Sequence, residues 1–194
     1  MPPRYCVYCA SSNRVDDRYL DAARIIGEII AGAGCTVVYG GGASGLMGQL
    51  ADGALARGGD VIGIIPRFMD KLEWGHAGLT ALVSVDDMHE RKRLMADRAD
   101  AIIALPGGCG TLEELAEVLT WKRLGLYLNP IILVNINGYY DPLITLLENM
   151  VSERFMDPRH LSMWSVVSTP GEVLAAIANA PRWNSEAVGF AVPR

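Results

Sequence analysis

The stretch DAIIALPGGCGTLEEL, residues 100–115, contains an apolar run, a glycine-rich break and the beginning of a helix. The run AIIAL has no alternating polar residues, which is typical of a strand buried on both faces of a parallel sheet. Pro106 and the glycines after it end the strand, and a helical pattern resumes at Thr111. A buried strand, a glycine-rich turn and a helix form the repeating unit of a doubly wound α/β sheet.

The same unit recurs along the rest of the chain. Strands are predicted at 4–9, 35–39, 60–65, 81–85, 100–105, 130–135 and 165–168, and helices at 17–32, 45–57, 87–98, 111–124, 141–153 and 171–179. Short links between them favour right-handed crossovers, so the predicted fold class is α/β, with a mainly parallel, Rossmann-like sheet flanked by helices.

Residues 1–180 are predicted to form a single domain, and residues 181–194 a C-terminal tail. We expect Trp183 and Phe190 to dock this tail on the domain or on a neighbouring subunit. The longest irregular link is predicted at 66–78, and a loop of that length in a compact domain is often functional.

The composition excludes several classes of protein. The 194 residues are 51% hydrophobic and 20% charged, which suits a globular chain, and the net charge of −5 disfavours general binding to nucleic acid or membranes. No apolar run could span a bilayer and no signal-peptide pattern opens the sequence, so the expected location is cytoplasmic. Cys6 and Cys9 lie within a predicted strand and are expected to be plain buried thiols. The histidines lack metal-ligand spacing, and no metal site is predicted.

Three strand-to-helix junctions could hold a ligand. They are YCASSN (8–13), YGGGASGLMG (39–48) and LPGGCGTLEE (105–114). Glycines let main-chain N–H groups approach an anion, and the helix N-terminus adds partial positive charge, so these loops predict a phosphate-bearing ligand. Ser12, Gly41 and Gly42 are candidate binding residues in the first two loops.

The glycine patterns do not match two common phosphate-binding motifs. Neither loop has the lysine of GxxxxGK[ST]. The dinucleotide fingerprint GxGxxG occurs at Gly40, Gly42 and Gly45, but it follows the second predicted strand rather than the first. The acid expected at the end of the following strand is also missing, since Asp60 begins that strand and Arg67 follows it. A nicotinamide cofactor is therefore disfavoured.

Charged residues near the glycine loops are candidates for ligand binding or catalysis. Arg91 and Lys92 lie on or beside the apolar side of the helix predicted at 87–98, where a half-buried cation needs an anionic partner. Helical side chains lean towards the N-terminus, so Glu114 can reach back over the loop at 107–111. The side chain of Glu113 points away from this loop. A favourable interaction with the helix dipole is enough to explain an acid at this position.

Together these residues resemble the Lonely guy (LOG) family of cytokinin-activating phosphoribohydrolases, many of which were once labelled lysine decarboxylases. The family signature PGGxGTxxE is intact at 106–114, and the segment M-H-x-R-K is present at 88–92. The segment YGGGASGLMG and the tripeptide LTW at 119–121 also match in order. The resemblance covers nearly all of residues 4–180.

The resemblance implies hydrolysis of N6-modified adenosine 5′-monophosphates to the free base and ribose 5-phosphate, with no cofactor. Arg91 and Glu114 match the catalytic pair. Further substrate-binding positions are Glu73, Lys92, Gly107, Gly108, Cys109, Gly110, Thr111, Leu112, Glu113 and Thr120. Similar proteins are homodimers with the active site near the interface. A carboxylate at Glu114 would stabilise the oxocarbenium-like charge on the ribose. The alternative is a carrier without turnover, resembling molybdenum-cofactor carrier proteins, which would not need Glu114.

Overall fold

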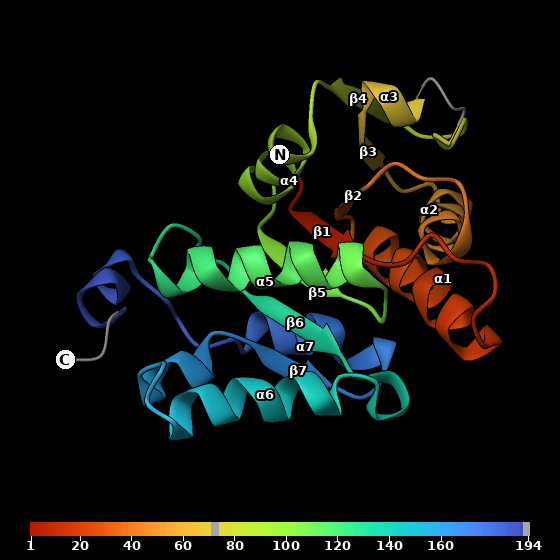
Figure 1. The fold of residues 1–194 in the computed structure, drawn as a ribbon. Coiled ribbons are helices and arrows are strands. Elements are labelled where there is room, and N and C mark those ends of the chain that lie inside the picture. Colours follow the sequence, from red (N-terminus) through yellow and green to blue (C-terminus); the bar gives the residue numbers. More distant parts are fainter. Residues whose placement is uncertain (71–73, 192–194) are drawn as a thin grey trace.

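The computed structural model describes residues 1–70 and 74–191, which build a parallel sheet flanked by helices (Figure 1). The strands are β1 (Arg4–Tyr8), β2 (Thr36–Tyr39), β3 (Val61–Pro66), β4 (Ala81–Val85), β5 (Ala101–Ala104), β6 (Ile131–Val134) and β7 (Ser165–Val167). Their spatial order is β4-β3-β2-β1-β5-β6-β7, and every neighbouring pair is parallel. The predicted α/β fold class and all seven predicted strands are confirmed.

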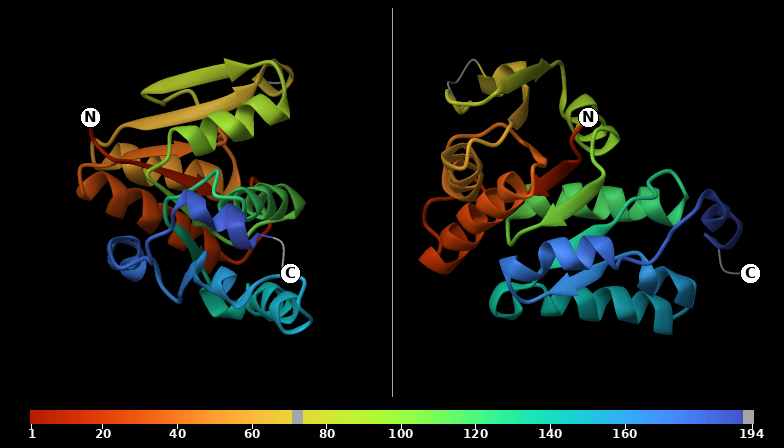
Figure 2. Two further views of the ribbon diagram at one scale, coloured as in Figure 1. Left: turned by 90° about the vertical axis from the view of Figure 1, so that its left-hand side faces the viewer. Right: turned by 180° about the vertical axis from the view of Figure 1, so that it is seen from behind.

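Helices cover both faces of the sheet. They are α1 (Asp17–Gly32), α2 (Gly45–Ala56), α3 (Arg67–Asp70), α4 (Met88–Asp97), α5 (Cys109–Arg123), α6 (Asp141–Ser152) and α7 (Val173–Ala178). Short 3₁₀ turns are η1 (Ile136–Gly138), η2 (Pro158–Ser162), η3 (Pro170–Glu172) and η4 (Ser185–Phe190). Helices α1, α2 and α7 pack on one face and α4, α5 and α6 on the other (Figures 1 and 2).

Some predicted boundaries differ from the structure. The link at 66–78 is not wholly irregular, because α3 begins directly after β3 and Gly75 forms an antiparallel bridge with Gly42. A helix of four residues is too short to produce a detectable apolar period. Helix α5 begins at Cys109, two residues before the predicted position, so that Gly110 belongs to its first turn. Glu73 lies outside the described residues.

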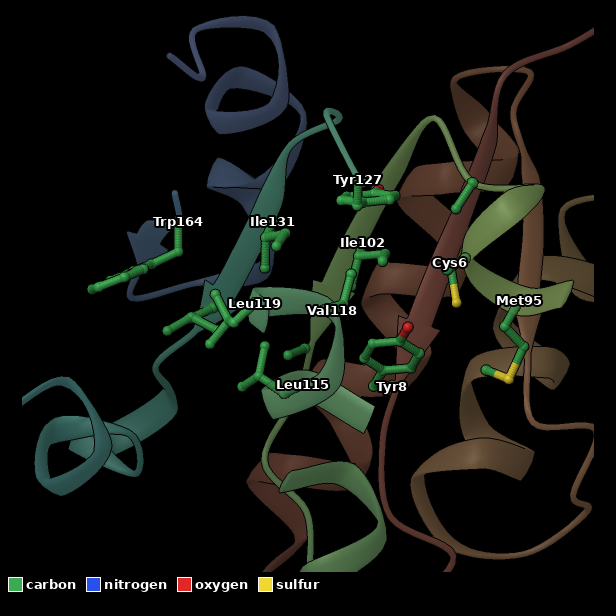
Figure 3. Packing of buried hydrophobic residues seen from close by; sticks show 14 of the residues in the cluster. Cys6, Tyr8, Met95, Ile102, Leu115, Val118, Leu119, Tyr127, Ile131 and Trp164 are labelled. Atoms are coloured by element: carbon green, nitrogen blue, oxygen red, sulfur yellow. The ribbon is translucent and has the colours of Figure 1, made fainter. Parts of the chain in front are cut away.

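The core explains why the strands are apolar throughout. Adjacent residues of a strand point to opposite faces, so Cys6 and Tyr8 of β1 lie under α5 while Val7 and Cys9 pack towards α1 and α2. Figure 3 shows Tyr8, Ile102 and Ile131 directed towards Leu115, Val118 and Leu119 of α5. Cys6 and Cys9 are buried free thiols, as predicted.

The C-terminal segment 183–191 lies beside the C-terminal end of α5 (Figure 1). The indole N–H of Trp183 donates to the main-chain oxygen of Lys122 at 2.6 Å, and Arg123 donates to the oxygen of Ala191. Phe190 packs against the ring of buried His160 at a centroid distance of 5.3 Å. This segment therefore shares contacts with α5 and η2. Within the described ranges, no helix is long and apolar enough to cross a membrane.

Candidate active site

A cavity lies where the strand order reverses between β1 and β5. It has a volume of about 600 Å³, within the range typical of small-molecule sites. Loops leaving the carboxyl ends of β1, β2 and β5 contribute to its wall, which is the expected ligand position in an open α/β sheet. Of the residues predicted from sequence, the cavity is lined by Ser12, Gly42, Arg91, Gly108, Gly110, Thr111 and Glu114.

The first turn of α5 presents unoccupied main-chain donors to this cavity. Gly108 is the N-cap residue and supplies no side-chain cap, so the N–H groups of the first turn lack the partners that a helix interior provides. A Cβ atom at Gly108 or Gly110 would have no neighbouring protein atom within 4 Å, so the space in front of the loop is open. This end of a 15-residue helix is well suited to bind an anion.

The two glycine-rich loops are not equivalent. At the start of α2, the side-chain oxygen of Asn13 accepts from Gly45 N at 2.6 Å, and the oxygen of Ala10 accepts from Met47 N at 3.1 Å. These protein groups already cap α2, whereas Gly108 of α5 has no such cap. The structure therefore favours α5 as the anion-binding helix, with the β1 and β2 loops forming other parts of the wall.

Arg91 is buried and is held by main-chain oxygens of β3 and of the loop that follows β2. Its Nε donates to the main-chain oxygen of Ile64 at 3.0 Å, and its Nη2 donates to that of Gly40 at 3.1 Å. A Cβ atom at Gly40 would lie 2.0 Å from Nη2, so only glycine permits this approach. The remaining Nη1 lies 3.5 Å from Oε1 of Glu114, which brings together the predicted catalytic pair.

Glu114 is a buried acid in the second turn of α5, and 5% of its surface is exposed. Burial raises the pKa of its carboxyl to about 7, and the nearby Arg91 guanidinium opposes this rise. The carboxyl and carboxylate forms are therefore both populated near neutral pH. A carboxyl with such a shifted pKa, placed in a cavity beside a cation, is typical of a catalytic group.

Lys92 makes a different connection. Its ammonium group binds the carboxylates of Glu113 and, at 3.1 Å, Glu117. These contacts join α4 to α5 beside the cavity. Neither Lys92 nor Glu113 lines the cavity. The predicted anionic partners of both buried cations are thus carboxylates of α5.

Five other predicted binding residues are not part of the cavity lining. They are Gly41, Gly107, Cys109, Leu112 and Thr120. A Cβ atom at Gly107 would lie 2.1 Å from Oγ1 of Thr111, so this glycine permits a tight loop. The Thr120 side chain is exposed, and its hydroxyl donates to the main-chain oxygen of Ala116.

An apolar part of the wall was not predicted from sequence. It is formed by Met47, Ile65, Met69, Trp74 and Met88. These residues come from α2, β3, α3, the link after α3, and α4. In a sequence, an apolar residue of a helix or strand is more often part of the core than of a binding site. The M-H-x-R-K segment could have indicated one of these wall residues, since Met88 lies one helical turn before Arg91.

Comparison with known proteins agrees with this geometry. The family described as "Possible lysine decarboxylase" matches residues 47–177. A cytokinin riboside 5′-monophosphate phosphoribohydrolase from Rhodococcoides fascians is 44% identical over 177 residues, covering 91% of this chain and 89% of the relative. One from Arabidopsis thaliana is 42% identical over 167 residues, covering 86% and 77%. The chain belongs to the LOG family.

Solved structures that share the fold include proteins named for a different role. The molybdenum cofactor carrier protein from Chlamydomonas reinhardtii superposes with a TM-score of 0.72 at 19% identity, covering 93% of this chain and 98% of that one. The molybdenum cofactor binding protein from Rippkaea orientalis has a TM-score of 0.71 at 22% identity, covering 92% and 96%. At these identities the likeness shows a shared fold. In this LOG family member, the signature segments are the ones that line the cavity at α4 and α5.

Proposed function

We propose that this chain hydrolyses the N-glycosidic bond of N6-modified adenosine 5′-monophosphates and releases the base and ribose 5-phosphate. The observation that carries the proposal is a buried carboxyl, Glu114, paired with Arg91 and one turn beyond the open N-terminus of α5. The names of relatives that cover most of the chain support the same reaction.

The charges of these groups indicate a separate role for each of them in the proposed reaction. The N–H groups from Gly108 to Thr111 bind the 5′-phosphate. Breaking the glycosidic bond builds positive charge on the ribose, which the carboxylate of Glu114 stabilises while it binds the sugar hydroxyls or orients water. The guanidinium of Arg91 offers only hydrogen-bond donors, so it positions the nucleotide or donates a hydrogen bond to the departing purine. The apolar wall would contact the N6 substituent.

The decarboxylase description of the matched family has little support in the site. Lysines can form Schiff bases with carbonyl cofactors only when the amine is available. Of the described lysines, Lys92 is bound to two carboxylates, and Lys122 donates to the main-chain oxygen of Asn129 at 2.6 Å. Neither lines the cavity.

We also propose that the protein is a homodimer and that the partner completes the binding site. Leu112, Glu113 and Thr120 are exposed on α5 and lie outside the cavity of their own subunit, although all three match substrate-binding positions. Light scattering should give twice the chain mass of 21.0 kDa. A monomer that hydrolyses the nucleotide would contradict this part of the proposal. A cytoplasmic location stays a prediction from the sequence.

The reaction is tested by incubating the protein with AMP and with isopentenyl adenosine monophosphate, and measuring free base. We expect base release, with a preference between the two that reports the substrate class. Nucleotides that bind but stay intact would favour the carrier alternative.

The role of Glu114 is tested with Glu114→Gln, which removes the negative charge but keeps the shape. We expect turnover to fall at least 100-fold while nucleotide affinity changes little, because the charge acts mainly in the transition state. Glu117→Gln is the matched control on the same helix, and it should retain most turnover. Unchanged turnover in Glu114→Gln would exclude Glu114 from the chemistry.

A further inference from the structure

Two adjacent tyrosines hold the glycine loop from behind. Tyr139 Oη donates to the main-chain oxygen of Gly107 at 2.6 Å, and Tyr140 Oη donates to that of Leu105, also at 2.6 Å. Both tyrosines come from the link between β6 and α6, more than 30 residues away along the chain. Neither lines the cavity. They therefore contact the loop without reaching its ligand side.

The tyrosines are themselves fixed in place. The side-chain oxygen of Asn135 accepts from Tyr140 N at 2.7 Å, and its amide donates to Asp141 at 2.7 Å. The two tyrosine rings meet edge to face at 5.3 Å, and Tyr19 of α1 meets Tyr139 at 6.0 Å. A hydroxyl supported in this way holds its acceptor in a defined direction.

The direction of the Gly107 carbonyl sets the direction of a donor in the cavity wall. In a planar trans peptide, the C=O of one residue and the N–H of the next point in opposite directions. Because the oxygen of Gly107 faces Tyr139, the N–H of Gly108 points away from Tyr139. Within the described part of the chain, no protein group accepts a hydrogen bond from this N–H.

We propose that Tyr139 and Tyr140 are positioning residues for the phosphate of the substrate. Tyr139 orients the Gly107–Gly108 peptide so that its N–H is available to the anion, and Tyr140 holds the preceding turn at Leu105. The loop is thereby organised before the ligand arrives, which lowers the ordering cost of binding. This inference rests on the proposed function, because it assigns the anion to the N-terminus of α5.

The test compares Tyr139→Phe and Tyr140→Phe with Tyr19→Phe. The first two lose a hydroxyl bonded to the loop, whereas the Tyr19 hydroxyl has no protein partner among the described residues. The inhibition constants of ribose 5-phosphate and adenine are measured for each variant. Loss of one hydrogen bond, about 1 kcal/mol, should weaken ribose 5-phosphate binding about fivefold. Adenine binding should be unchanged, as should both constants in Tyr19→Phe.

A purely structural role gives a different result. It would lower the melting temperature and the fraction of active enzyme, but leave both inhibition constants at wild-type values, and this would overturn the inference. Equal weakening of adenine and ribose 5-phosphate would overturn it too. If the wild-type protein hydrolyses no nucleotide, the proposed function fails separately. Binding of ribose 5-phosphate by calorimetry then still tests the tyrosines, with the same expected ratio between variant and wild type.

Discussion

At the scale of single residues, the site depends on an arginine and an acid that are both removed from water. Each would be costly alone, because a buried charge needs a partner or hydrogen bonds. Arg91 has both, in the main-chain oxygens of Gly40 and Ile64 and in the carboxyl of Glu114. These two main-chain oxygens set the direction of the guanidinium, so the position of Arg91 relative to Glu114 depends on the backbone of β3 and of the loop after β2.

Gly40→Ala should therefore lower kcat/KM, although Gly40 itself supplies no charged group. The new Cβ atom would lie 2.0 Å from Arg91 Nη2 and would force the guanidinium to move. A displacement of about 1 Å in an active site can cost about 100-fold in rate, and we expect a loss of that order in kcat/KM. Gly32→Ala, at the end of α1 with no atom within 4 Å of the new methyl group, is the control. Wild-type kinetics in Gly40→Ala would show that the position of Arg91 is unimportant.

The protonation of Glu114 should be visible in the free protein. Burial raises the pKa of its carboxyl to about 7, so the negative charge is gained as the pH rises through that value. Carbon NMR of glutamate-labelled protein should show one carboxyl titrating near pH 7 that is missing from Glu114→Gln. Arg91→Met should move this titration to higher pH, because the guanidinium favours the charged form. A carboxyl that titrates near its ordinary value of about 4.3 would contradict the burial argument.

At the scale of secondary-structure elements, helices α2 and α5 both begin after glycine-rich loops but have different roles. Asn13 and Ala10 cap α2, whereas the first turn of α5 opens into the cavity. The pairing of Lys92 with α5 carboxylates keeps α4 against this helix. The end of α5 that we propose as the phosphate site is thus an end without a side-chain cap.

Gly110→Ala should separate stability from binding in this helix. Alanine favours helix over glycine by up to about 1 kcal/mol, and the methyl group meets no protein atom, so unfolding should become harder. The same methyl group enters the cavity and should weaken ribose 5-phosphate binding. Chemical denaturation and an inhibition assay measure the two effects. Gly171→Ala, also without a neighbour for its Cβ, should leave binding unchanged. Tighter ribose 5-phosphate binding in Gly110→Ala would contradict the assignment of α5.

At the scale of the whole molecule, the reversal of strand order between β1 and β5 creates the cavity, and the C-terminal segment stabilises the far end of α5. Trp183 and Phe190 rest on α5 and η2, at the opposite end of the helix from the glycine loop. The segment should therefore matter for stability more than for chemistry.

Truncation after Ala180 tests this separation together with the domain limits predicted from sequence. The shortened chain loses the Trp183 and Arg123 hydrogen bonds and the Phe190 contact, and we expect a loss of about 2 to 4 kcal/mol in unfolding free energy. Nucleotide hydrolysis per folded molecule should stay near the full-length value at low temperature. Trp183→Ala is the milder variant, with a smaller loss expected. A truncated chain without cooperative unfolding would show that residues 1–180 are not a self-sufficient domain.

The sequence by itself determined the strands, the longer helices and the identity of the charged residues near the glycine loop. These features are local, since uninterrupted apolar runs, helical periods and glycine-rich turns are all encoded within short segments. The PGGxGTxxE segment alone predicted that Glu114 would lean over the loop, because this depends only on helix geometry.

Tertiary structure decided which of these groups meet. Arg91 depends on carbonyls of β3 and of the loop after β2. The apolar wall is gathered from several elements, and Tyr139 reaches the loop from beyond β6. It also decided that two main-chain donors at the start of α2 are bonded by Asn13 and Ala10 of the β1 loop. Contacts between segments distant in the chain depend on strand order and register, which no local pattern of residues encodes.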